Sequence, residues 1–285
     1  MSTAARVAAF VALLAVTFAA ATVAGRAVDP EDGRNDAHSA GSAHGTHGDA
    51  DASQLGGGTP DGLSLADTEY RLQTSTTRLP AGRRARLRFR IVDGRGATVR
   101  DFDVEQARRL HLIVVRRDLD GYQHLHPAQA ADGGWSVALT LPSAGAYRAF
   151  ADFRIDGRQH VLGVDQLAPG RFAPRELPPP ATVARVAGYD IAWRAHGDGQ
   201  LSFVVRRDGV PVTDLDPHLG ARGHLVALRQ GDLAYRHAHP ARSGSAGAQI
   251  SFERVVLQAG VYRLFLQFRH GGRVHTATFT HQVRR

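Results

Sequence analysis

The residue type best suited to chemistry in this 285-residue sequence is histidine, which occurs 15 times. Three histidines fall within the stretch HLIVVRRDLDGYQHLHP, at His111, His124 and His126. Imidazole nitrogen is a preferred ligand of Cu(II), Zn(II) and Ni(II). Cysteine is absent and methionine occurs only at position 1, which excludes disulfides, thiolate ligands and a methionine-rich copper(I) site. The composition therefore points to a metal site built from imidazole alone, with Cu(II) or Zn(II) as the expected ion.

The histidine pattern recurs in a second copy of the same unit. Each of four histidines has a counterpart, and the pairs are His111 and His224, His124 and His237, His126 and His239, and His160 and His275. Between them the residues differ, because LIVVRRDLDGYQ in the first copy becomes LVALRQGDLAYR in the second. Since the histidines are retained while their neighbours change, we predict that these eight side chains bind metal. The alternative is structural: the histidines brace the turn after each hairpin by hydrogen bonding to backbone carbonyls.

The elements that position these histidines are predicted to be β-strands. Short apolar stretches alternate with Asp-Gly, Gly-Gly and proline-rich turns, and no segment shows a sustained 3.6-residue period. In the first copy we expect strands near residues 69–76, 85–92, 109–116, 122–126, 135–141, 146–154 and 158–165. About seven strands in about 100 residues is the size of an immunoglobulin-like sandwich. The predicted fold class is all-β, with two tandem immunoglobulin-like β-sandwich domains after an amino-terminal hydrophobic helix and a disordered linker.

The chain divides into five predicted segments. These are a signal peptide or membrane anchor at 1–27, a disordered linker at 28–62, the first repeat at 63–169, a proline-rich connector at 170–183 and the second repeat at 184–285. The apolar run within the first segment is long for a cleaved signal and weakly hydrophobic for an anchor, so both readings stay open. Either one places the repeats outside the cytoplasm, because acidic residues follow the run. The linker carries further histidines that could capture a divalent ion weakly or serve only as part of a neutral tether.

The first histidine stretch is predicted to be one hairpin with a loop centred on Leu119. This register sets Leu112 opposite His126, and a competing register with a two-residue Asp-Gly turn is disfavoured because the second copy lacks such a turn. One face of the hairpin carries His111, Ile113, Val115, Tyr122, His124 and His126. That face is half apolar, which is typical of a contact surface, and the second copy repeats it with Val226, Leu228 and Tyr235. We therefore predict that the two faces pack on each other or on a partner.

Two smaller motifs are predicted to be structural. The segments SAGAYRAF and QAGVYRLF resemble the corner of immunoglobulin-like sandwiches in which a tyrosine hydroxyl bonds to nearby backbone, so Tyr147 and Tyr262 are not expected to do chemistry. The Asp-Gly pair at 156–157 suits a type I′ hairpin turn.

The charge pattern indicates no nucleic-acid partner. The net charge is +8, but the arginines are spread through the strand-like segments without a run or aromatic interleaving. No glutamate or aspartate stands beside the histidines as a general base in a recognisable motif, so we do not predict an enzyme.

The stretch HLIVVRRDLDGYQHLHP, followed by LPSAGAYRAFADF, resembles a group of uncharacterised bacterial envelope proteins with immunoglobulin-like repeats and a hydrophobic amino terminus. Such proteins are often found beside heavy-metal or copper transport functions. The resemblance implies metal handling by association, with a metal transporter or another envelope protein as partner and a membrane contact if the amino-terminal segment is not cleaved. The predicted function is an extracytoplasmic Cu(II) or Zn(II) buffer or delivery protein, and the alternative is an envelope structural or interaction module.

Overall fold

The computed structural model describes residues 62–285 apart from 198, 239, 241–246, 254 and 285. These residues belong to one compact unit. The predicted amino-terminal apolar segment and nearly all of the predicted linker lie outside the described residues. Within the described part of the chain, no helix has the length and apolar character needed to cross a membrane.

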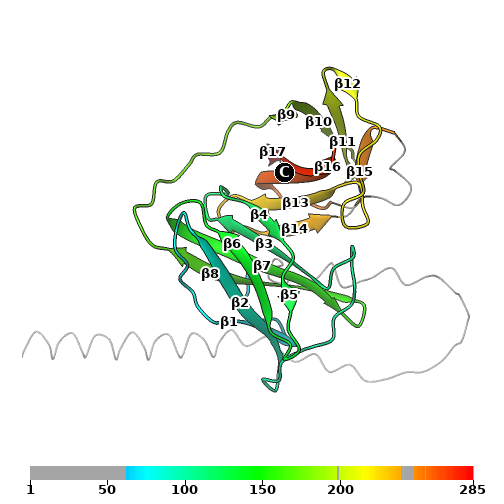
Figure 1. Ribbon diagram of the computed structural model, residues 1–285. Coiled ribbons are helices and arrows are strands. Elements are labelled where there is room, and N and C mark those ends of the chain that lie inside the picture. Colours follow the sequence, from blue (N-terminus) through cyan, green and yellow to red (C-terminus); the bar gives the residue numbers. More distant parts are fainter. Residues whose placement is uncertain (1–61, 198, 239, 241–246, 254, 285) are drawn as a thin grey trace, which may run out of the picture. The chain divides into compact units, whose positions relative to one another are not determined.

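The first repeat folds as a sandwich of two four-stranded antiparallel sheets (Figure 1). Its strands are β1 (Tyr70–Thr74), β2 (Arg84–Asp93), β3 (Leu110–Arg116), β4 (Gln123–Leu125), β5 (Ala128–Gln129), β6 (Trp135–Thr140), β7 (Gly145–Ile155) and β8 (Arg158–Ala168). One sheet has the order β1-β2-β6-β5 and the other the order β4-β3-β7-β8. This arrangement of neighbours is that of an immunoglobulin-like sandwich. All seven predicted strands are present, and the two-residue β5 was not predicted.

The second repeat has the same plan. Its strands are β9 (Val183–Val186), β10 (Tyr189–Ala195), β11 (Leu201–Arg207), β12 (Val210–Pro211), β13 (His224–Arg229), β14 (Tyr235–Ala238), β15 (Gln249–Phe252), β16 (Gly260–His270) and β17 (Arg273–Val283). The sheet β14-β13-β16-β17 corresponds to β4-β3-β7-β8 of the first repeat. The second sheet has the order β12-β11-β10-β9, and β15 pairs with β11.

Each sandwich closes around its own apolar core because side chains alternate between the two faces of every strand. In β2 the alternating residues Leu87, Phe89 and Ile91 are buried, while the arginines between them are exposed. A second layer of core residues comes from the facing sheet, including Leu112 and Val114 of β3. The second sandwich has an equivalent cluster of buried residues. The all-β fold with two tandem immunoglobulin-like domains is therefore confirmed.

Two predicted local motifs are present in the first sandwich. The Tyr147 hydroxyl is buried and donates a 2.9 Å hydrogen bond to the Ser143 carbonyl, which closes the corner before β7. Asp156 and Gly157 connect β7 to β8 with φ values of 49° and 76°, the left-handed pair that a type I′ turn requires.

The β3–β4 hairpin differs from its predicted register by one residue. Leu112 pairs with Leu125 and Ile113 with His124, whereas the prediction set Leu112 opposite His126. The loop is shorter than predicted because Leu119 adopts a φ of 67° and its N–H donates to the Arg116 carbonyl. Residues directly opposite each other in an antiparallel pair lie on the same face of the sheet, so a one-residue shift changes which side chains share a face. The observed pairing places the outward residues of β3 and β4 on the same face.

The outward faces of the two hairpins pack against each other, as predicted. A third apolar cluster joins Ile113, Val115, Leu119 and Phe150 of the first sandwich to Val226, Leu228, Leu233, Tyr235 and Phe265 of the second. The contacts are reciprocal: the Tyr122 ring stacks on Phe265 at 4.0 Å between centroids, and the Tyr235 ring stacks on Phe150 at 5.0 Å. Equivalent residues of the two copies thus exchange equivalent contacts, which is the pattern of a pseudo-two-fold axis.

Candidate metal centre

The histidines of the first hairpin meet on the face that contacts the second sandwich. His111 begins the outward row of β3, and His124 lies on the adjacent β4. His111 Nδ1 lies 2.9 Å from His124 Nε2. His126 follows β4, and its ring centroid is 5.2 Å from that of His111 and 4.8 Å from that of His124. Three of the predicted ligands are therefore neighbours, as the strand–turn–strand pattern required.

The second sandwich adds histidines to the same cluster. One ring nitrogen from each of His111, His124 and His237 lies within 4.8 Å of the others. His224 also joins, with its ring centroid 5.6 Å from that of His124 and 6.1 Å from that of His237. The prediction gave each repeat its own histidine set, whereas the structure brings the two sets together at one interface. His239, the remaining predicted member, lies outside the described residues.

The outer nitrogens of His124 and His237 face hydrogen-bond acceptors. His124 Nδ1 lies 2.8 Å from Gln267 Oε1, and His237 Nδ1 lies 2.9 Å from Asp152 Oδ2. Because a carboxylate and an amide oxygen only accept, both Nδ1 atoms carry the proton and each Nε2 keeps its lone pair in the neutral ring. Gln267 is held in this orientation by a second bond from its Nε2 to Thr276 Oγ1, at 3.2 Å.

Backbone carbonyls anchor the other two rings in the same way. His224 Nε2 lies 3.0 Å from the His218 carbonyl, and His111 Nε2 lies 3.4 Å from the Glu105 carbonyl. The two carbonyls belong to equivalent tight loops before β13 and β3. When Nε2 donates to the carbonyl, Nδ1 keeps its lone pair. In His111 the 2.9 Å contact of Nδ1 with His124 Nε2 competes with this arrangement, because one of those two nitrogens must carry a proton while no ion is bound. Four histidines thus have one ring nitrogen beside an acceptor that can hold the ring in place.

Burial keeps the rings of His111, His124 and His126 neutral. Removal from water lowers the pKa of His111 to about 4 and that of His126 to about 3, and it holds the pKa of His124 well below its usual range. The neighbouring imidazoles act in the same direction, because a second positive charge in the cluster would repel the first. Neutral imidazole is the form that binds metal, so the cluster is ready for an ion at neutral pH.

A buried carboxylate stands beside the cluster. The Asp152 side chain is 4% exposed, and it accepts hydrogen bonds from Tyr235, Gln159 and His237. Although burial alone would raise its pKa, the hydrogen bond and charge interaction with His237 lower the pKa of Asp152 below its usual range. The position equivalent to Asp152 in the second copy is Gln267, so the pseudo-symmetric site carries a carboxylate on one side and an amide on the other.

His160 and His275 lie away from this cluster. His160 Nδ1 is 2.7 Å from Asp67 Oδ2, and its ring stacks on Phe153 and packs edge-on against Tyr70. His275 repeats this packing against Phe268 and Tyr189. The two residues recur between the copies because they occupy the same place against the same aromatic neighbours. Their predicted role as ligands stays a prediction.

Four residues that orient the ligands were not predicted from the sequence: Asp152, Gln267, Glu105 and His218. The first two lie on β7 and β16, directly opposite His111 and His224 in the register. A polar residue among the apolar residues of AFADF and LFLQF was the available signal. The other two act through backbone carbonyls, which carry no side-chain signature.

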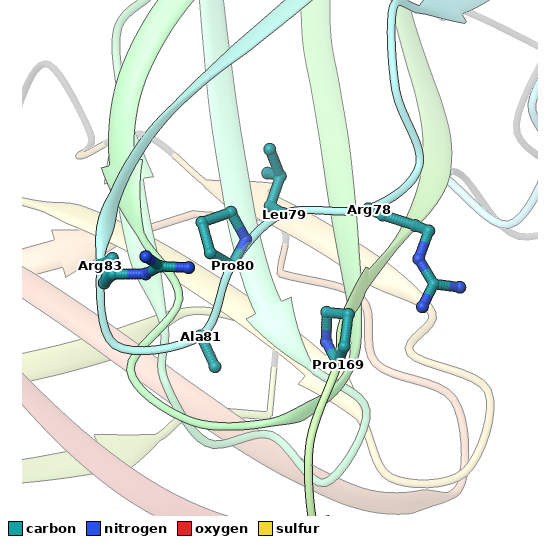
Figure 2. A pocket seen from close by; sticks show the side chains of 6 residues that line it. All are labelled: Arg78, Leu79, Pro80, Ala81, Arg83 and Pro169. Carbon is teal, nitrogen blue, oxygen red and sulfur yellow. The ribbon is translucent and has the colours of Figure 1, made fainter.

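A separate hollow of about 370 Å³ lies at the edge of the first sandwich, lined by Arg78, Leu79, Pro80, Ala81, Arg83 and Pro169 (Figure 2). Figure 2 shows Arg78 and Arg83 on opposite sides of it. Its lining contains neither histidine nor carboxylate, so its chemistry differs from that of the histidine cluster.

A family model described as a domain of unknown function, DUF8832, matches residues 64–167 and 184–285. Each match covers one sandwich. The description carries no association with metal transport, so that part of the resemblance stays a prediction. No curated protein matches the sequence.

Among solved structures, an Escherichia coli adhesin, FdeC, is 14% identical over 78% of this chain and 66% of its own chain, with a TM-score of 0.27. A segment of two fibronectin type-III domains from chicken tenascin is 10% identical over 76% of this chain and 100% of its own, with a TM-score of 0.24. The Yersinia pseudotuberculosis adhesin InvE is 11% identical over 78% of this chain and 61% of its own, with a TM-score of 0.26. TM-scores this low do not indicate a shared function.

Proposed function

This chain belongs to the DUF8832 family of domains of unknown function, and we propose that it is an extracytoplasmic metal-binding protein that holds Cu(II) or Zn(II) as a buffer or delivery factor. The ion would lie between the two sandwiches, at the ligand nitrogens of His111, His124 and His237. The extracytoplasmic location rests on the amino-terminal apolar run alone. A metal transporter or another envelope protein is the proposed recipient.

The observation that carries the proposal is the anchoring of ligand histidines by acceptors on their outer nitrogens. Metal-binding histidines almost always donate their second N–H to a carboxylate, a carbonyl or water, which fixes the ring and raises its basicity. Here the Asp152 carboxylate anchors His237, and the Gln267 amide oxygen anchors His124. One ring nitrogen from each of His111, His124 and His237 lies within 4.8 Å of the others. In a tetrahedral complex with bonds of about 2.0 Å, ligand nitrogens lie about 3.3 Å apart, so small side-chain rotations complete the site.

Charge balance supports a cation at this place. The Asp152 carboxylate is buried, and burial lowers the pKa of His111 and of His124 in the same cluster. Burial of an ionised carboxylate is costly unless a positive charge or strong hydrogen bonds compensate for it. A metal ion bound to His237 would supply that charge one imidazole away, in the carboxylate–histidine–metal arrangement of known sites.

The rival function is bracing of the interface by the histidines themselves. It is favoured by the 2.9 Å contact between His111 and His124, which becomes an ordinary hydrogen bond if His111 carries its proton on Nδ1. In that tautomer His111 Nε2 carries no proton and cannot donate a hydrogen bond to the Glu105 carbonyl. In the rival case the cluster stabilises the docking of the two sandwiches and binds metal no better than exposed histidines do.

Titration of the whole chain with Cu(II) and with Zn(II) separates the two functions. We compare the unmodified protein with a variant in which His111, His124 and His126 are changed to Ala, and with a control, His196→Ala, which removes an exposed histidine outside the cluster. The cluster variant is expected to lose at least about 100-fold in affinity, because several ligands are removed. The control is expected to bind as the unmodified protein does. Equal, weak binding by all three proteins would overturn the proposal and favour bracing.

A further inference from the structure

We infer that the ion is Zn(II) and that four histidines, two from each sandwich, hold it in a closed tetrahedral site. Metal binding would then stabilise the contact between the two sandwiches. The four are His111, His124, His224 and His237. The inference rests on the proposed function and adds to it the number of ligands, their geometry and the ion that fits them.

The four rings lie at nearly equal distances from one another. The six distances between ring centroids are 5.2 Å for His111–His124, 5.2 Å for His111–His237, 5.6 Å for His124–His224, 5.6 Å for His124–His237, 6.1 Å for His224–His237 and 6.3 Å for His111–His224. Four points with six similar separations form a tetrahedron. The pseudo-two-fold relation exchanges His111 with His224 and His124 with His237, so each sandwich contributes two corners.

The size of this tetrahedron suits a metal ion. A bond of about 2.0 Å places the centroid of a bound imidazole about 3.2 Å from the ion, and tetrahedral angles then separate the centroids by about 5.2 Å. The two shortest separations already have this value, and both involve His111. The two longest share His224, so an inward shift of that one ring would bring all six separations close to this value.

A square-planar site does not fit these distances. Four imidazoles in a plane would give four separations of about 4.5 Å and two diagonals of about 6.4 Å. Two diagonals of a square have no corner in common, whereas the two longest separations observed meet at His224. Tetrahedral nitrogen coordination is typical of Zn(II), while Cu(II) favours the tetragonal arrangement.

The anchoring of the four rings agrees with their arrangement. Each has one nitrogen on an acceptor, which is Glu105, Gln267, His218 or Asp152. His126 differs from them, because among the described residues its ring contacts are with His111 and His124 only. It belongs to one side of the cluster and lies outside the tetrahedron.

Four protein ligands leave no open position on the ion. Closed zinc sites of this kind hold the ion without catalysis, whereas catalytic sites keep a place for water or substrate. Since the ligands come from both sandwiches, the bound ion opposes their separation in addition to the apolar contacts of Phe150 and Phe265 with the opposite tyrosines.

Titration with Co(II) followed by visible absorption tests the coordination number, because four-coordinate Co(II) absorbs far more strongly than six-coordinate Co(II). The whole chain, freed of metal by a chelator, is expected to give an intense four-coordinate spectrum that Zn(II) abolishes. His224→Ala is expected to lose that spectrum and at least about tenfold in Zn(II) affinity, while His196→Ala keeps both. Thermal unfolding of the metal-free proteins identifies a variant that fails to fold.

A second variant reports on position 224 directly. The chain has no cysteine, so His224→Cys introduces its one thiol, and a ligand at this position would add a sulfur-to-Co(II) charge-transfer band without background. Absence of this band in a folded variant, or a six-coordinate spectrum in the unmodified chain, would overturn the four-histidine site. If Co(II) and Zn(II) do not bind the unmodified chain at all, the proposed metal-binding function fails as well.

Discussion

Removal of one hydroxyl group should have opposite effects at two equivalent tyrosines of the interface. Tyr122 and Tyr235 occupy the same position in the two hairpins, and each stacks on a phenylalanine of the other sandwich. The Tyr235 hydroxyl donates a 2.9 Å hydrogen bond to the buried Asp152 carboxylate. The Tyr122 hydroxyl is buried and has no hydrogen-bond partner among the described residues. The difference arises because Gln267 stands where Asp152 stands in the other half.

The magnitudes follow from the two environments. A buried polar group without a partner costs about 1–3 kcal/mol, so Tyr122→Phe is expected to raise the free energy of unfolding by about 1 kcal/mol or more. A hydrogen bond to a charged group contributes about 1.5–3 kcal/mol, so Tyr235→Phe is expected to lower it by about 2 kcal/mol. For a protein of this size each kcal/mol corresponds to a change of about 2–4 °C in Tm.

Urea unfolding of both variants and of the unmodified chain, with a chelator present, measures these differences. Both substitutions keep the stacked ring, so the dependence of the free energy on urea should be unchanged and the midpoints should move in opposite directions. If both variants lose stability by similar amounts, the environments of the two hydroxyl groups are not as described, and the asymmetry between Asp152 and Gln267 has no energetic consequence.

Three further outcomes are expected. Lowering the pH of the metal-free protein from about 6.5 towards 4 should decrease the free energy of unfolding, because the unfolded chain takes up protons at buried histidines that the folded chain does not. His111 and His126, with pKa values of about 4 and 3, alone contribute as much as about 2.7 kcal/mol per pH unit. Unfolding in urea at pH 7, 6 and 5 checks this, and a flat profile would contradict it. Asp152→Asn should weaken Zn(II) binding by about 10–100-fold in a competition assay with a chelator, because the group that anchors His237 loses its charge. Unchanged affinity would show that Asp152 does not support metal binding. Gly157→Ala should lower the free energy of unfolding by about 1 kcal/mol through backbone strain alone, because φ is 76° and no atom lies within 4 Å of the added methyl group; a neutral result in thermal unfolding would be inconsistent with a left-handed residue there.

The sequence was sufficient to predict seven strands of the first sandwich, because alternation and turn residues are local signals. It also predicted that the outward faces of the hairpins are contact surfaces, from the apolar residues Ile113 and Val115 between the histidines. The hairpin register was wrong by one residue. Its loop is set by the Arg116 side chain, which pairs with Asp118 and Asp120, and by a leucine in the left-handed region. Turn propensities do not report such a side-chain arrangement.

The composition of the site could be predicted only in part. Repetition identified His111, His124 and their counterparts, but it also selected His160 and His275, which recur through packing against aromatic rings. The sharing of one cluster by both copies depends on contacts between residues more than 80 positions apart, such as that of Asp152 with His237. No pattern within a single repeat encodes that contact.

The difference between Asp152 and Gln267 has an evolutionary consequence. If an ancestor of this chain formed the same interface as a homodimer of single repeats, every change at this position appeared twice across the two-fold axis. Two buried carboxylates beside the same imidazoles would repel each other, and two amides would leave the cluster without a negative charge. Joining the two copies in one polypeptide lets each half change independently, so one carboxylate can be buried where a symmetric dimer must bury two or none.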